Sequence, residues 1–389
     1  MEGPLRSRLV NCSDFQFGVV ATETIENALL HLAQQNEQAV KEAAGRTGSF
    51  RETRIVGVSL CSPGCPGIHS LDQAGLELRN PPASASQVLG LKFVFLLSEQ
   101  WCLEKSVSYQ AVEILERFMV KQAEYICRQA TLQLRSNETE LQNWRALKEQ
   151  LFNKFILRLV SCVQLASKLS FHYKIVSNIT VLNFLQALGY GHTKEELLES
   201  ELDILKSLNF QINLPTPLAY VEMLLEVLDG DLSFIINLLA RHMPLIPTVG
   251  RQKQGYNGCL VPASQLHATC LTLLDLVYLL HEPIYESLLR ASIENSTPSQ
   301  LQGEKFLSVK EDFMLLAVGI IAASAFIQNH ECWSQVIGHL QSITGIASES
   351  IAEFSYAVLT HSVGANTPGQ QQPVPKAARA LRTAASSNA

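Results

Sequence analysis

The residues of this sequence that could ligate a metal ion are Cys61, Cys65 and His69, which follow one another at intervals of about four positions. Thiolate and imidazole are ligands that zinc prefers, but a tetrahedral structural site needs a fourth ligand. This spacing does not supply one. The pattern therefore does not define a zinc site, and we expect no bound metal.

Catalytic chemistry is not indicated either. The sequence contains none of the motifs that mark a phosphate-binding loop, a dinucleotide-binding loop, a zinc-protease helix or a nucleophile elbow. Its ten histidines are scattered, and pairs such as His281-Glu282 belong to no motif. We expect a non-enzymatic protein with no cofactor and no small-molecule substrate.

One carboxylate stands out by its position. On a helical wheel Leu198, Leu202, Leu205 and Leu208 form one stripe, and Glu201 falls inside that stripe. A carboxylate on a buried face is costly unless a cation or backbone amides satisfy it. The wheel leaves open whether the partner group comes from the same domain or from another protein.

Composition and charge limit the classes of function. The chain has 389 residues, of which 47% are hydrophobic and 17% charged, and its formal net charge is −6. Because it lacks an excess of Lys and Arg, direct nucleic-acid binding is disfavoured.

The longest apolar run, residues 313–328, is shorter than the ~20 residues that span a bilayer, so we expect a buried helix and no membrane segment. Nine cysteines, an odd number, favour reduced thiols in the cytoplasm or nucleus.

The elements that must position these residues are helices, because apolar residues recur with helical periodicity and strand signals are nearly absent. Thr193 and Glu196 predict a capping box at the start of the helix that carries Glu201. Thr216 and Pro217 predict the start of another helix. We expect an all-α protein with two successive sets of about five helices each.

The domain organisation follows from changes in composition. The stretch after residue 55 is rich in Gly, Pro and Ser and resembles the peptide encoded by an Alu-type repeat. The expected parts are an N-terminal segment with one amphipathic helix (1–55), a disordered insert (56–91), a first helical domain (92–214), a second helical domain with an insert near 229–255 (215–363) and a disordered tail (364–389). The N-terminal helix, residues 24–44, suits docking on a partner as well as packing back on its own chain.

Three motifs, in this order, resemble the N-terminal box of the cyclin family. They are Ala111-Val-Glu-Ile-Leu-Glu-Arg-Phe118, Leu165-Ala-Ser-Lys-Leu169 and Glu201-Leu-Asp-Ile-Leu-Lys-Ser-Leu-Asn-Phe210. The resemblance implies two cyclin-box-like domains, the second degenerate. It also implies that Lys168 and Glu201 contact the regulatory helix of a cyclin-dependent kinase. From its position on the helical wheel alone, Lys168 is predicted to be an ordinary solvent-facing lysine.

Residues 15–38, 96–120 and 276–301 are similar to a meiotic branch of the cyclin family. That similarity implies meiotic recombination proteins as partners, a role in crossover maturation, and a nuclear location on meiotic chromosomes. The family's substrate-docking patch would fall at residues 86–90, where the chain reads Ser-Gln-Val-Leu-Gly, so we expect no substrate docking there. A scaffold that works without a kinase is the main alternative, and an adaptor on nucleic acid is a less favoured one.

Overall fold

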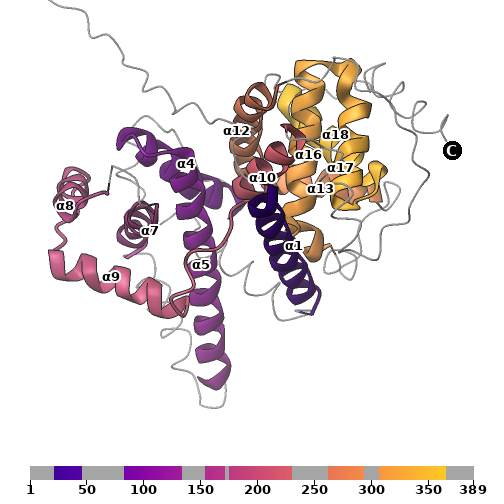
Figure 1. Ribbon diagram of the computed structural model, residues 1–389. Helices are drawn as coiled ribbons and strands as arrows, with labels where there is room; N and C mark the ends of the chain where they lie inside the picture. Colours follow the sequence, from indigo (N-terminus) through magenta and orange to yellow (C-terminus); the bar gives the residue numbers. More distant parts are fainter. Residues whose placement is uncertain are drawn as a thin grey trace, which may run out of the picture.

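The computed structural model describes residues 22–45, 83–133, 154–170, 175–229, 262–292 and 306–364. Within these ranges the regular secondary structure is helical, with no strand, which confirms the predicted all-α class. Figure 1 shows two groups of helices, with the N-terminal helix beside the second group. Three expected disordered segments lie mostly outside the described residues. They are the tail, of which only Gly364 is described, most of the first insert and nearly all of the second insert.

The first group is built around one central helix. Its members are α4 (Ala83–Gln100), α5 (Lys105–Gln133), α7 (Phe155–Leu169), α8 (Asn178–Ala187) and α9 (Lys194–Ser207). Helix α7 contacts all four of the others. It is apolar on nearly all sides, and every residue from Ile156 to Ser167 except Arg158 is buried. A helix with this composition is stable only when neighbours surround it.

Helix α4 begins earlier than the sequence indicated. It starts at Ala83, inside the segment 56–91 that was expected to be a disordered insert. The residues that follow Pro82 include Ala, Ser, Gln and Leu and no further proline, so nothing interrupts the helix on the N-terminal side of Phe93. Proline just before a helix is well tolerated, because the first amides of a helix lack partners in any case.

The second group also surrounds one apolar helix. Its members are α10 (Pro217–Asp229), α12 (Ala263–Leu279), α13 (His281–Ser292), α15 (Leu307–Lys310), α16 (Phe313–Gln328), η1 (His330–Cys332), α17 (Trp333–Thr344) and α18 (Ser348–Gly364). Helix α16 packs against α10, α12, α17 and α18. Its residues from Leu316 to Ala325 are all buried, which confirms the prediction of a core helix for this apolar run.

No single helix among the described residues is long and apolar enough to cross a bilayer, and α12 with α13 passes that test only as a pair bent by 86°.

Helix α1 (Thr22–Gly45) packs back on its own chain, against α10, α15 and α16 of the second group. Its apolar stripe includes the buried side chains of Ile25, Leu29 and Leu32. The Tyr220 hydroxyl donates to the Leu32 carbonyl at 3.2 Å, and the Met314 amide donates to Asn36 Oδ1 at 3.2 Å. The apolar face of this helix therefore belongs to the core of the chain.

Polar contacts between α5 and α12 join the two groups. The Tyr109 hydroxyl donates to Asp275 Oδ1 at 2.8 Å, and Lys105 Nζ donates to Asp275 Oδ2 at 2.7 Å. The Tyr278 hydroxyl donates to Glu113 Oε1 at 2.9 Å. The rings of Tyr109 and Tyr278 stack with their centroids 5.1 Å apart. These contacts cross the boundary between the first and second helical domains.

Candidate functional site

Helix α9 buries a different side from the one that the leucine stripe predicted. Glu201 is buried, as expected, and so is Leu208. Leu198 and Leu202 are instead 43% and 42% exposed, and Leu205 is half-buried. The remaining buried residues of the helix are Leu197, Ser200 and Ile204. Glu201 thus lies at the centre of the buried face, while two of the predicted core leucines face solvent.

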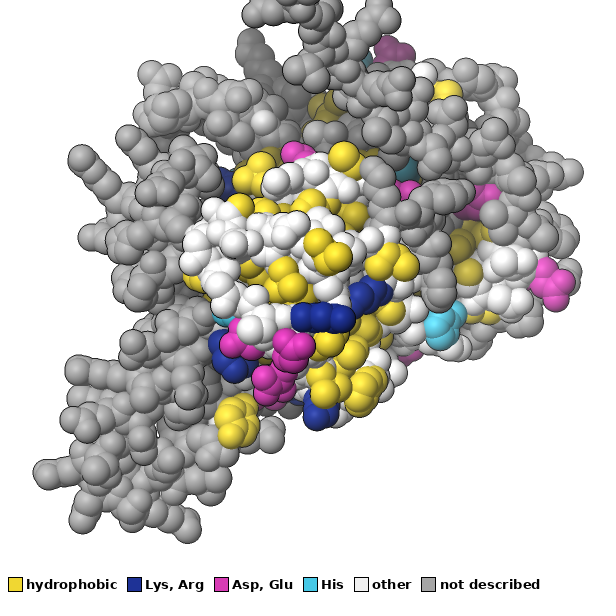
Figure 2. All heavy atoms as spheres, turned by 90° about the vertical axis from the view of Figure 1, so that its left-hand side faces the viewer, with side chains coloured by type: hydrophobic (Ala, Val, Ile, Leu, Met, Phe, Trp, Pro, Cys, Tyr) yellow, Lys and Arg dark blue, Asp and Glu magenta, His cyan; other side chains and the backbone are white. Residues whose placement is uncertain are grey.

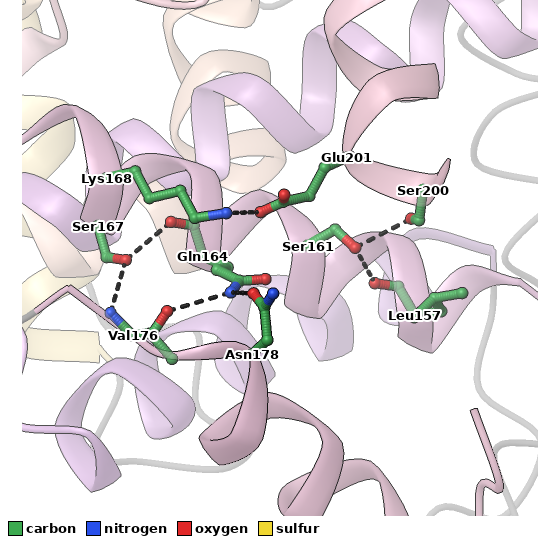
Figure 3. Close-up of polar contacts among 9 residues, drawn as sticks. All are labelled: Leu157, Ser161, Gln164, Ser167, Lys168, Val176, Asn178, Ser200 and Glu201. Carbon is green, nitrogen blue, oxygen red and sulfur yellow. Dashed lines mark hydrogen bonds and ion pairs between the residues drawn. The ribbon is translucent and has the colours of Figure 1, made fainter. Parts of the chain in front are cut away.

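The cation that satisfies Glu201 comes from α7. Lys168 Nζ lies 2.5 Å from Glu201 Oε1, and the side chains are 36% and 9% exposed respectively. Figure 3 shows the two side chains reaching toward each other from neighbouring helices. The two residues that the cyclin resemblance singled out are therefore brought together. Lys168 is not the freely solvated lysine that its own helix suggested.

The two helices that carry the pair are held close together by small polar residues. Ser161 Oγ donates to the Leu157 carbonyl at 2.8 Å and lies 2.9 Å from Ser200 Oγ (Figure 3). Both serines are buried. Because a serine side chain is short, this contact lets the backbones of α7 and α9 approach each other, which positions Lys168 within reach of Glu201.

Hydrogen bonds from side chains of α7 hold the connection between α7 and α8 against α7. Gln164 Nε2 donates to the Val176 carbonyl at 3.1 Å and to Asn178 Oδ1 at 2.6 Å. The Val176 amide donates to Ser167 Oγ at 3.1 Å. The C-terminal half of α7, which includes Lys168, is therefore supported from this side as well (Figure 3).

The start of α9 has the predicted capping box. The Glu196 amide donates to Thr193 Oγ1 at 3.2 Å, and the Thr193 amide donates to Glu196 Oε2 at 3.0 Å. The bond from the Thr193 amide, followed by the contact with His192, holds the pKa of Glu196 below its ordinary value. The box sets where the helix begins and hence which face carries Glu201.

The end of α9 presents an aromatic side chain to solvent. Regular helix stops at Ser207, and the following residues Asn209 and Phe210 have φ angles of 51° and 60°. The Phe210 amide donates to the Leu205 carbonyl at 2.8 Å, which closes the turn. A left-handed conformation is uncommon for a bulky residue. Phe210 is 64% exposed in this turn.

An apolar surface lies beside the ion pair. We call Lys168, Glu201, Leu198 and Leu202 the α9 face. Apolar side chains gather on the side of the molecule that Figure 2 shows, where α8 and α9 lie, with acidic and basic side chains next to them. Large exposed apolar side chains grouped with polar residues are typical of protein interaction sites. The sequence missed these exposed leucines because it assigned them to the core.

Metal binding has no support within the described ranges, where no group of His, Cys, Asp or Glu could hold an ion. Cys61, Cys65 and His69 lie outside those ranges.

Comparison with known proteins defines the class as cyclin-like. The chain belongs to the family of cyclin N-terminal domain-containing protein 1. It is 80% identical to the mouse protein of that name over 386 residues, 99% of this chain and 97% of the mouse protein. It is 72% identical to the human protein over 390 residues, the whole of both chains.

No family model matches the sequence. Among solved structures, a viral cyclin from herpesvirus saimiri covers 81% of this chain and 96% of its own, with 16% sequence identity and a TM-score of 0.39.

Proposed function

We propose that this cyclin-like protein is a non-enzymatic regulatory subunit that binds a cyclin-dependent kinase through the α9 face. The observation that carries the proposal is the ion pair of Lys168 and Glu201 beside the exposed Leu198 and Leu202. The cyclin resemblance implies kinase contact for the two charged residues. The exposed leucines supply apolar area that a partner helix can bury.

The pair suits recognition because it is fixed before a partner arrives. Glu201 is the more buried member and holds the Lys168 ammonium group in one position. An ammonium group has three N–H donors, and the partly exposed Lys168 can direct others toward carbonyl or carboxylate oxygens of a partner. Fixing a side chain in its bound position lowers the entropic cost of association.

Charge reversals test this role. Lys168→Glu and Glu201→Lys should each abolish co-purification of the kinase, and Leu202→Glu, which changes an exposed side chain, should weaken it while the chain stays folded. Glu353→Lys is the matched control, since Glu353 is an exposed acid on α18. Kinase recovery that is equal for all four variants and the unmodified chain would refute the role.

The biological setting is part of the proposal. The similarity of residues 15–38, 96–120 and 276–301 to a meiotic branch of the cyclin family supports a role in crossover maturation in germ-cell nuclei, with recombination proteins as partners. Affinity purification of the chain from germ cells, followed by mass spectrometry, tests it. Recovery of recombination proteins is expected. A partner set without any of them would overturn the meiotic assignment.

A scaffold that binds recombination proteins without a kinase is the second candidate. It is favoured by one observation, that Lys168 and Glu201 already satisfy each other within the chain. Kinase activity in immunoprecipitates distinguishes the two functions. Activity that disappears with the charge reversals supports the kinase subunit, whereas recombination proteins recovered without kinase activity support the scaffold.

A further inference from the structure

The contact between the two helical groups contains two reciprocal pairs of side chains. The Tyr109 hydroxyl of α5 donates to Asp275 Oδ1 of α12 at 2.8 Å. In the other direction, the Tyr278 hydroxyl of α12 donates to Glu113 Oε1 of α5 at 2.9 Å. Each helix thus contributes one tyrosine and one acid, and we call these four residues the joint.

The aromatic part of the joint does not depend on pH near neutrality. The two tyrosine rings stack, and Phe95 of α4 packs against them edge-on, with its centroid 6.0 Å from that of Tyr109 and 6.2 Å from that of Tyr278. Burial is the main cause that holds the pKa of both hydroxyls above the ordinary value of 10. Both tyrosines therefore stay protonated and remain hydrogen-bond donors.

The two acids of the joint differ in how their charge is offset. Asp275 Oδ2 also accepts from Lys105 Nζ at 2.7 Å, so a cation lies directly against it. Glu113 forms no ion pair within the described part of the chain. An acid that is enclosed without a bonded cation favours its neutral form. Of the two acids, Glu113 is therefore the one whose protonation changes near neutral pH.

The groups around Glu113 act on its charge in both directions. Burial, followed by repulsion from Glu116, raises its pKa to about 8, and Glu311 acts in the same direction. The hydrogen bond from Tyr278 and the guanidinium of Arg117 act in the opposite direction. Glu116 and Arg117 lie on α5 itself, Tyr278 comes from α12, and Glu311 follows α15. Ionised Glu113 is thus destabilised while the joint is closed, and separation of α5 from α12 gives its carboxylate access to water.

We propose that the joint is a protonation-dependent contact that holds the two helical groups together while Glu113 is protonated and opens when Glu113 ionises, with both groups still folded. Each group has its own apolar central helix, α7 in the first and α16 in the second. Contacts between such units are where relative motion is expected. Opening moves the second group, together with the α1 helix packed on it, relative to the α9 face. The inference holds whichever partner the α9 face binds.

The direction of the pH effect follows from proton linkage. The closed joint keeps a proton that the open joint, where Glu113 has its ordinary pKa of 4.5, releases at lower pH. The open population should therefore rise with pH between 4.5 and about 8, by at most about tenfold per pH unit, and become level above that range.

Nitration of tyrosines by tetranitromethane on the full chain, mapped by mass spectrometry, measures this opening. Tyr109 is fully buried, so its rate of nitration reports how often the joint is open. At pH 8 Glu113→Gln should slow nitration of Tyr109 at least about tenfold, because a neutral amide keeps the hydrogen bond from Tyr278 and does not ionise. The effect should be smaller at pH 7, where the open population of the unmodified chain is lower.

Two controls separate opening of the joint from unfolding and from a general loss of charge. Tyr285 of α13 is buried against Phe354 of α18, and in the unmodified chain at pH 8 it should be nitrated at least about tenfold more slowly than Tyr109. Glu353→Gln, which removes an exposed acid on α18, should leave nitration of Tyr109 unchanged.

Equal rates of Tyr109 nitration in the unmodified and Glu113→Gln chains at pH 8 would overturn the proposal. So would a rate for Tyr285 that matches that of Tyr109 in the unmodified chain, since both rings would then be exposed only by unfolding of the whole chain.

Discussion

Lys168 Nζ and Glu201 Oε1 are 2.5 Å apart, although the two residues are on different helices and their side chains differ fourfold in exposure, 36% against 9%. The buried partner depends on the exposed one. If Lys168 is removed, Glu201 remains as a carboxylate inside an apolar face, and its desolvation is no longer offset.

Lys168→Met should therefore lower the free energy of unfolding by roughly 1–3 kcal/mol. Combining it with Glu201→Leu should recover most of that loss, because no charge is then left buried. Urea titration of the single and double variants measures both effects. A double variant as unstable as Lys168→Met would contradict this explanation of the loss.

Glu113 should make stability depend on pH. Burial, and then repulsion from Glu116, raises its pKa to about 8 from an ordinary value of 4.5. Between these two values the folded chain holds a proton that the unfolded chain has released. The free energy of unfolding should then fall as pH rises through this window and become level above it, with a total decrease of roughly 3–5 kcal/mol.

Glu113→Gln should remove that dependence, since a neutral amide oxygen still accepts the hydrogen bond from Tyr278. At pH 8 the variant should unfold at higher urea concentration than the unmodified chain, and at pH 5 the two should be close. If the free energies of unfolding of the variant and the unmodified chain change in parallel between pH 5 and pH 8, Glu113 does not titrate in that range.

Two glycines should respond oppositely to alanine. A Cβ on Gly319 of α16 would lie 2.8 Å from Phe354 Cγ of α18, closer than a side chain can pack, so Gly319→Ala should cost about 1–3 kcal/mol. A Cβ on Gly338 of α17 would meet nothing within 4 Å. Gly338→Ala should stabilise the chain by about 0.5–1 kcal/mol. A Gly319→Ala chain that melts at or above the temperature of the unmodified chain would contradict the close approach of α16 and α18.

The sequence predicted where helix α9 begins, but it did not predict which side chains of that helix are exposed. The capping residues Thr193 and Glu196 are local signals, and a local signal is enough to place the start of a helix. The exposure of Leu198 and Leu202 could not be predicted in this way. A leucine on a wheel is normally assigned to the core, and only the packing of α7 against α9 shows which side of α9 is covered.

The contacts between the two helical groups could not be predicted from the sequence either. Glu113 and Tyr278 are 165 residues apart in the sequence. A glutamate and a tyrosine at that separation carry no sequence signal that they form a hydrogen bond. Lys168 was singled out only by the cyclin resemblance, because its own helix does not reveal that Glu201 lies opposite. Side-chain pairs between distant segments depend on how helices pack, which local periodicity does not specify.

The central claim is that the pair of Lys168 and Glu201 contacts a kinase as well as stabilising the chain. The most direct test exchanges the two charges, by combining Lys168→Glu with Glu201→Lys, and measures co-purification of the kinase beside thermal stability. We predict that the exchanged chain regains stability lost in the single variants but does not recover the kinase. Recovery of the kinase at the level of the unmodified chain would show that the pair serves only the fold.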